Sequence, residues 1–276
     1  MAMSVGRPPA ENPEEAGKAM NEEATWGGYG LNPALAVSMV KASELLGNDG
    51  VISTGYPELD KLIGDGGLAK GQIYLFYGSQ RFVDDMIHGL LVRGSALGRV
   101  AYMNNTDYYS GKTFVDLDKL ARYAKAIGMD PFMVFRNVYF SAAYNELRQP
   151  YAARALAEMI EREAGSTSLV LVHRLSRFLG GRLHRRVGNI DLSLSLLKRV
   201  CTAHGTPMVI TVDCRVGERP AISTTMMLHT AGVMVAFREV GPDMIQAELV
   251  KHHSKRTPSS ALVIPGDYAQ LDGWQG

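Results

Sequence analysis

The sequence predicts an α/β fold with a mostly parallel sheet, helices on both faces and antiparallel strands at the C-terminal edge. Short apolar segments of strand length recur at residues 73–77, 100–103, 138–140, 169–172, 208–212 and 232–237. Segments with helical periodicity separate many of them, at residues 83–93, 114–127, 151–164 and 190–203. Such alternation is typical of parallel sheets whose strands are joined by helices.

The character of individual segments supports each part of this prediction. Residues 169–172 read Leu-Val-Leu-Val without a polar residue, which suits a strand covered on both faces. Residues 232–264 read as successive strands with no helix between them. We therefore expect the last strands to extend the sheet as an antiparallel edge.

The chain is expected to have three parts. Residues 1–30 are predicted to form a flexible acidic tail, because the first 25 residues hold five glutamates and two basic residues, a balance of −3. Residues 31–50 are predicted to form a helix and a linker, with Pro33 in the first turn and Gly47 just past the end. Residues 51–276 are predicted to form the core domain.

Composition excludes several classes of protein. The 29 basic and 28 acidic residues give a net charge of +1, which excludes function through bulk positive charge but permits local basic patches. Two cysteines are too few for a disulfide scaffold or a paired-cysteine zinc site. No apolar run reaches the roughly 18 residues that span a bilayer. We expect a cytoplasmic protein without a membrane partner.

The connection after residues 73–77 lies where open α/β sheets bind ligands. A phosphate-binding loop requires the pattern G-x-x-x-x-G-K-[ST], in which glycines expose backbone N–H groups, lysine neutralises phosphate and the hydroxyl holds magnesium. Val83 replaces the second glycine, and Asp84 and Asp85 replace the lysine and the hydroxyl. A carboxylate in place of the lysine repels a triphosphate. We expect a degenerate nucleotide site formed by Gly78, Ser79, Gln80, Arg81, Asp84, Asp85 and His173.

Two further positions argue against ATP hydrolysis. The strand at 169–172 is followed by His173 and not by a magnesium-binding aspartate. The strand at 100–103 is followed by Asn104 and Asn105, where a catalytic carboxylate is needed. We therefore expect no catalytic residues, no metal site and no cofactor, while weak non-hydrolytic ATP binding stays open.

Residues 110–113, Ser-Gly-Lys-Thr, copy the end of a phosphate loop. The first glycine of that motif would be Thr106. Thr113 is better explained as the cap of a helix starting at residue 114, with Asp116 as its capping-box partner.

The order of these segments resembles the RecA/RadA recombinase superfamily, and archaeal RadA paralogs in particular. The similarity is carried by Ile52-Ser53-Thr54-Gly55 with Glu58-Leu59-Asp60-Lys61-Leu62-Ile63, and by Gly128-Met129-Asp130-Pro131 with Asn137-Val138-Tyr139. It covers roughly residues 50–265 and implies a RecA-like core. The functional residues depart from the family pattern, so the resemblance implies an ATPase-dead paralog.

A basic segment follows the strand at 169–172. Residues 174–199 hold seven basic residues and one aspartate, a balance of +6. Glycines flank residues 180–188, which predicts a loop, and RecA-like proteins carry a DNA-binding loop at this place. Arginines there would follow a phosphate backbone, although no aromatic residue lies inside the loop. The expected DNA contacts are Arg174, Arg177, Arg182, His184, Arg185 and Arg186, with a protein interface or a solvated loop as open alternatives.

A second basic stretch, residues 251–256, is predicted to form a turn at the sheet edge. Related recombinases have basic residues near here, close to the ATP of a neighbouring subunit. This resemblance implies that Lys251, Lys255 and Arg256 lie at a subunit interface.

The function expected from these features is a DNA-binding accessory, mediator or regulator, in homologous recombination and DNA repair. Its expected partners are single-stranded DNA and a RadA-like recombinase or a second copy of the chain, which implies association with the nucleoid. A KaiC-like protein-interaction scaffold without DNA binding, and a protein that binds but does not hydrolyse ATP, are the alternatives.

Overall fold

A computed structural model describes residues 50–64, 66–106, 115–163, 165–179, 183–213, 225–241 and 244–263. Every described residue belongs to the unit Ser38–Gly276. The predicted acidic tail and residues 31–49 of the predicted helix and linker lie outside the described residues.

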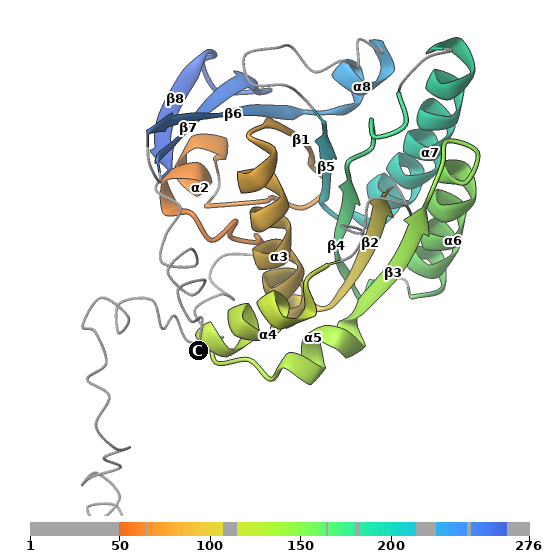
Figure 1. Cartoon of the computed structure of the whole chain (residues 1–276), viewed down its shortest axis with the longest axis horizontal. Helices are drawn as coiled ribbons and strands as arrows, with labels where there is room; N and C mark the ends of the chain where they lie inside the picture. Colours follow the sequence, from red (N-terminus) through yellow and green to blue (C-terminus); the bar gives the residue numbers. More distant parts are fainter. Residues whose placement is uncertain are drawn as a thin grey trace, which may run out of the picture. The chain divides into compact units, whose positions relative to one another are not determined.

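Eight strands form one sheet in the order β3-β2-β4-β5-β1-β6-β7-β8 (Figure 1). The strands are β1 (Ile73–Gly78), β2 (Arg99–Asn105), β3 (Val138–Ala143), β4 (Thr167–His173), β5 (Met208–Val212), β6 (Val233–Gly241), β7 (Met244–Lys251) and β8 (Ser259–Val263). Strands β1 to β6 pair in parallel, and β7 runs antiparallel to both β6 and β8. The predicted α/β class, the mostly parallel sheet and the antiparallel C-terminal pairing are confirmed.

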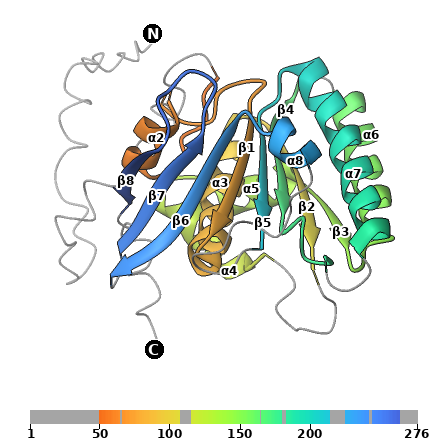
Figure 2. The same ribbon diagram turned by 90° about the horizontal axis from the view of Figure 1, so that it is seen from above.

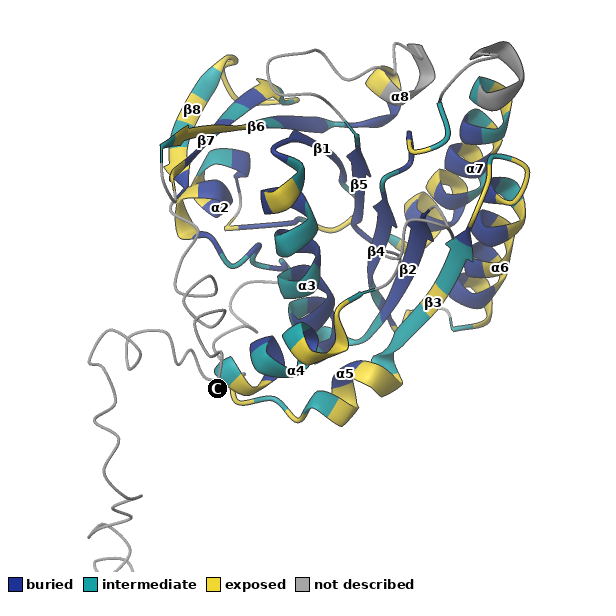
Figure 3. Ribbon diagram, in the orientation of Figure 1, coloured by how far each residue is buried: buried dark blue, intermediate teal, exposed yellow. Residues whose placement is uncertain are grey.

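Helices cover both faces of the sheet (Figure 2). The described helices are α2 (Pro57–Ile63), α3 (Gln80–Leu97), α4 (Leu117–Ala126), α5 (Pro131–Asn137), α6 (Gln149–Arg162), α7 (Leu183–His204) and α8 (Thr225–Thr230). Side chains alternate across each strand, so Tyr74 and Phe76 of β1 pack with α2 to α5, while Ile73 and Leu75 pack with α6 and α7. The central strands are therefore buried on both faces, as Figure 3 shows.

Two predicted helix starts are wrong. Helix α4 begins at Leu117, and its cap is Asp116, whose side chain accepts a hydrogen bond from the backbone N–H of Lys119 at 2.9 Å. Thr113 lies outside the described residues. Helix α7 begins at Leu183, so residues 183–188 are helical where their flanking glycines predicted a loop. Gly188 is exposed within this helix, where glycine costs only about 1 kcal/mol relative to alanine.

The segment that opens the core is held by one buried carboxylate. Asp60 accepts hydrogen bonds from the Ser53 hydroxyl at 2.6 Å, the Thr54 hydroxyl at 2.6 Å and the Thr54 backbone N–H at 2.8 Å. Burial raises the pKa of Asp60, although these hydrogen bonds act in the opposite direction. The residues that carry the family resemblance here thus have a structural role.

Candidate functional site

The junction between β1 and α3 leaves no room for a phosphate-binding loop. Strand β1 ends at Gly78 and α3 begins at Gln80, so Ser79 is the whole connection. The N–H of Val83 donates to the carbonyl oxygen of Ser79 at 3.0 Å, inside the first helical turn. Residues of the expected loop are therefore helical, and one of the N–H groups that would surround phosphates is already bonded.

Gly78 and Ser79 are fixed by the neighbouring strand β6. Gly78 has a φ of 117°, and a Cβ placed on it would lie 2.0 Å from the carbonyl oxygen of Phe237. The N–H of Ser79 donates to that same oxygen at 2.8 Å, and the Ser79 hydroxyl donates to Glu239 at 2.6 Å. Close packing against β6 requires a glycine at position 78 independently of any phosphate.

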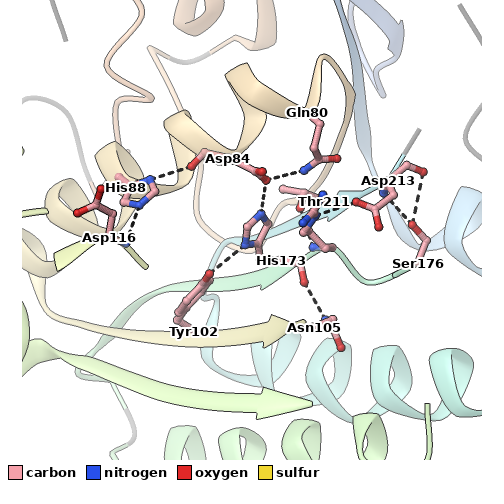
Figure 4. A network of polar contacts seen from close by, with 11 residues as sticks. Gln80, Asp84, His88, Tyr102, Asn105, Asp116, His173, Ser176, Thr211 and Asp213 are labelled. Atoms are coloured by element: carbon pink, nitrogen blue, oxygen red, sulfur yellow. Dashed lines mark hydrogen bonds and ion pairs between the residues drawn. The ribbon is translucent and has the colours of Figure 1, made fainter. Parts of the chain in front are cut away.

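Asp84 and His173 form a direct pair at the carboxyl edge of the sheet (Figure 4). Asp84 lies in the second turn of α3, and His173 ends β4, 89 residues later. The Nε2 atom of His173 lies 2.7 Å from Oδ1 of Asp84, and Gln80 donates to the same oxygen. The two positions where a nucleotide site needs a lysine and an aspartate thus hold a carboxylate and an imidazole that bind each other.

The imidazole of His173 is also held from its other side. Nδ1 lies 2.9 Å from the hydroxyl of Tyr102 on β2, and the two rings stack with centroids 6.1 Å apart. A carboxylate accepts only, so Nε2–H of His173 donates to Asp84, and the Tyr102 hydroxyl lies at hydrogen-bond distance from Nδ1. Every polar atom of the ring is satisfied by the protein.

The ionisation of these groups follows from their contacts. Burial alone would raise the pKa of Asp84, but the hydrogen bond and charge of His173, with the charge of Arg174, hold that pKa below its usual value. Burial, with the nearby charge of Asp84, raises the pKa of Tyr102, which therefore remains a hydroxyl. The pair therefore consists of an ionised Asp84 carboxylate and a His173 ring in which both nitrogens have a hydrogen-bond partner.

The end of β2 is also occupied by internal hydrogen bonds. Asn105 is fully buried, and its amide donates to the carbonyl oxygen of His173 at 2.8 Å. Gln149 of α6 donates to the side-chain oxygen of Asn105 at 3.0 Å and to the carbonyl oxygen of Leu175 at 2.9 Å. Asn105 therefore joins β2, β4 and α6.

Arg174 has a structural contact that the sequence did not predict. Its φ is 54°, uncommon for a residue other than glycine. Its N–H donates to the Thr211 hydroxyl at 2.8 Å, and its Nε donates to Asp213 at 2.8 Å. The N–H of Asp213 in turn donates to Ser176 at 2.7 Å. Arg174, predicted to contact DNA, is paired with a carboxylate of the same chain.

Asp85 and His88 connect α3 to α4. The Tyr123 hydroxyl donates to Asp85 at 2.9 Å, and Lys119 forms an ion pair with the same carboxylate. Nδ1 of His88 lies 2.8 Å from the carbonyl oxygen of Asp84, and its Nε2 accepts the N–H of Asp116 at 3.2 Å. Burial lowers the pKa of His88, consistent with a neutral ring.

Of the remaining predicted DNA contacts, Arg177 is exposed in the turn after β4. Arg81, which was predicted for the degenerate nucleotide site, is exposed on the first turn of α3. Arg182 lies outside the described residues, as do the side chains of His184, Arg185 and Arg186, whose backbone forms the start of α7.

The second basic stretch is largely bonded within the chain. The ammonium of Lys251 donates to the carbonyl oxygens of Leu228 and Ala231 at 2.6 and 2.7 Å, beside the end of α8. Lys255 donates to the carbonyl oxygen of Lys61 at 2.6 Å, at the end of α2. Both lysines lie at helix C-termini, where the dipole favours cations. Arg256 is exposed.

No known protein-family model matches this sequence. Within the described ranges, no group of three His, Cys, Asp or Glu residues is placed to hold a metal ion. A membrane-spanning helix is likewise not found in that part of the chain.

Proposed function

We propose that this chain is a RecA/RadA-like paralog without ATPase activity that acts as a DNA-binding accessory in homologous recombination and DNA repair. The observation that carries the proposal is the Asp84–His173 pair. It joins the two positions where a nucleotide site needs a phosphate-binding lysine and a magnesium-binding aspartate. A triphosphate entering this edge would meet the Asp84 carboxylate and would have to displace an internal hydrogen bond.

A chain that keeps the α/β core without the residues that bind phosphate and magnesium is expected to act by binding DNA or another protein. The connection of a single residue between β1 and α3 supports the same view, since the chain has no loop there to surround phosphates. The buried contacts of Asp60 and Gly78 preserve the core although the site is lost. The role fits a partner of an active recombinase, or a second copy of the chain, on single-stranded DNA.

The DNA-binding part of the proposal rests on the basic segment after β4. Arg177 is exposed there, and Arg185 and Arg186 belong to the first turns of α7, which has no acidic residue in its first turn. Positive charge at a helix N-terminus is unfavourable unless an anion compensates it. A phosphate backbone supplies such anions.

Fluorescence anisotropy of labelled single-stranded DNA tests the proposal, at about 50 and about 200 mM salt. The wild type is expected to bind more weakly at the higher salt, and Arg177→Ala/Arg185→Ala/Arg186→Ala is expected to lose most binding. Lys125→Ala, which removes an exposed lysine of α4 outside the basic segment, is the control. No binding at low salt would contradict the proposal and favour the KaiC-like scaffold.

A further inference from the structure

The start of α6 carries an exposed aromatic ring among arginines, and we propose that it binds single-stranded DNA by stacking a base on Tyr151. The residues concerned are Leu147, Arg148, Tyr151, Arg154 and Arg177, called the α6 surface below. The inference rests on the proposed function and adds to it the residues that hold the bases.

Exposure and spacing place these side chains together. Tyr151 is 67% exposed and Leu147 is 59% exposed, values that leave the tyrosine ring open to solvent. Arg148 and Arg154 are also exposed. Residues 148, 151 and 154 follow one another at intervals of three, so they form one stripe along the helix. The aromatic ring lies between two arginines.

The charge of this helix end is opposite to what the helix dipole favours. Arg148 is the N-cap of α6 and makes no side-chain capping hydrogen bond, and the first turn has no acidic residue. Acidic groups are the stabilising ones at this end of a helix. An anion from outside, such as a phosphate, would compensate the dipole and the arginine together.

A buried side chain fixes the α6 surface to the turn after β4. Gln149 is 1% exposed and donates to the carbonyl oxygen of Leu175 at 2.9 Å. Arg177 follows two residues later, and its N–H donates to the carbonyl oxygen of Arg174 at 2.9 Å, which closes the turn. Arg177 and the start of α6 are thus held at the same edge of the sheet.

The α6 surface continues the basic segment of α7. Both helices start at the carboxyl edge and lie side by side (Figures 1 and 2). Arg199 of α7 donates a hydrogen bond to Glu161 of α6 at 3.3 Å, and these two residues are 38 positions apart in the sequence. Because the two helices run in parallel, Arg148 and Arg186, which are also 38 positions apart, have their backbones at the same level. Among the described acidic residues nearby, Glu146 and Asp191 are half-buried, and Glu158, one turn beyond Arg154 on α6, is exposed.

The α6 surface supplies the aromatic ring that the basic segment lacks. Proteins that bind single strands combine a positively charged groove with aromatic rings on which bases stack. The segment at 180–188 has arginines but no aromatic residue. Tyr151 provides the ring, and Arg148, Arg154 and Arg177 provide phosphate contacts beside it.

The test measures the affinity of labelled oligo-dT for the full chain by anisotropy. Tyr151→Ala is expected to weaken binding about 5- to 150-fold, and Tyr151→Phe, which keeps the ring, is expected to bind like the wild type. Arg148→Gln and Arg154→Gln are each expected to reduce the slope of log affinity against log salt by about 0.7. Phe132→Ala, which removes an aromatic ring 69% exposed on α5, is the control and should leave affinity unchanged.

The results separate this inference from the function on which it rests. If the wild type binds and Tyr151→Ala binds as tightly as Phe132→Ala, the α6 surface is refuted while the proposed function stands. If the wild type does not bind oligo-dT at low salt, both are refuted. Thermal unfolding of each variant checks that a lost affinity does not reflect a lost fold.

Discussion

Removing the carboxylate of Asp84 tests how much the Asp84–His173 hydrogen bond contributes to the stability of the fold. In Asp84→Ala, His173 keeps an Nε2–H donor without an acceptor, and its side chain is only 11% exposed. A hydrogen bond to a charged group contributes about 1.5–3 kcal/mol. Because the Asp84 side chain is 38% exposed, solvent screens part of this interaction. We expect a loss of about 1.5–2.5 kcal/mol, or about 3–10 °C in Tm for a domain of this size.

Urea unfolding followed by circular dichroism at pH 7 measures the loss. A double-mutant cycle with His173→Phe, which keeps a ring beside Tyr102, isolates the coupling of the pair. Glu158→Ala, which removes an exposed carboxylate from α6, is the control and should change stability by less than about 0.5 kcal/mol. A coupling energy below about 0.5 kcal/mol, comparable to that of an exposed pair, would show that the Asp84–His173 hydrogen bond does not stabilise the fold in this way.

The pH dependence of the same pair has a defined sign. The pKa of Asp84 is lower in the folded chain than its ordinary value of 3.8. Its contribution is therefore fully present above pH 3.8 and is lost as the pH falls from there through the folded pKa. Stability curves of wild type and Asp84→Ala should converge in acid, and parallel curves would contradict this assignment.

Three further predictions concern single positions. Gly78→Ala is expected to lower the free energy of unfolding strongly, because the added Cβ would lie 2.0 Å from a backbone oxygen. Gly89→Ala is expected to stabilise α3, because a Cβ there would meet no atom within 4 Å. Urea unfolding compares the two variants. His88 has a lowered pKa, so stability should fall as the pH drops below about 6.5, and His88→Gln should flatten that slope in a urea series. Burial raises the pKa of Cys201 to about 12, so in a Cys214→Ser background a thiol reagent should react only after unfolding.

The fold was accessible from the sequence because its central strands are mostly apolar and are separated by segments with helical periodicity. Strand β1 is buried along its whole length and β4 is buried from Leu169 to His173, so both appear in the sequence as runs of consecutive apolar residues such as 169–172. The start of α7 was not accessible, since Gly188 and the neighbouring arginines suggest a loop locally. The helix there packs from Ile190 onward, and tertiary contacts outweigh the weak local preference.

The sequence showed which residues of a nucleotide site are replaced, but not which contacts the replacing residues make. Asp84 and His173 were each identified as replacements, and their pairing depends on two elements 89 residues apart. Tyr102 lies within an apolar strand pattern, so nothing local marks its hydroxyl as a partner of His173. The contact of Arg174 with Asp213 likewise joins the ends of β4 and β5, which only the sheet order brings together.

Phosphate release measures directly whether the chain lacks ATP hydrolysis, as we propose from the Asp84–His173 pair. The purified chain would be assayed with ATP and magnesium, with and without single-stranded DNA, beside Asp84→Ala prepared in the same way. We expect no phosphate release above background from the wild type under either condition. DNA-stimulated release by the wild type that disappears in Asp84→Ala would contradict this expectation, because a contaminating ATPase would not respond to that substitution.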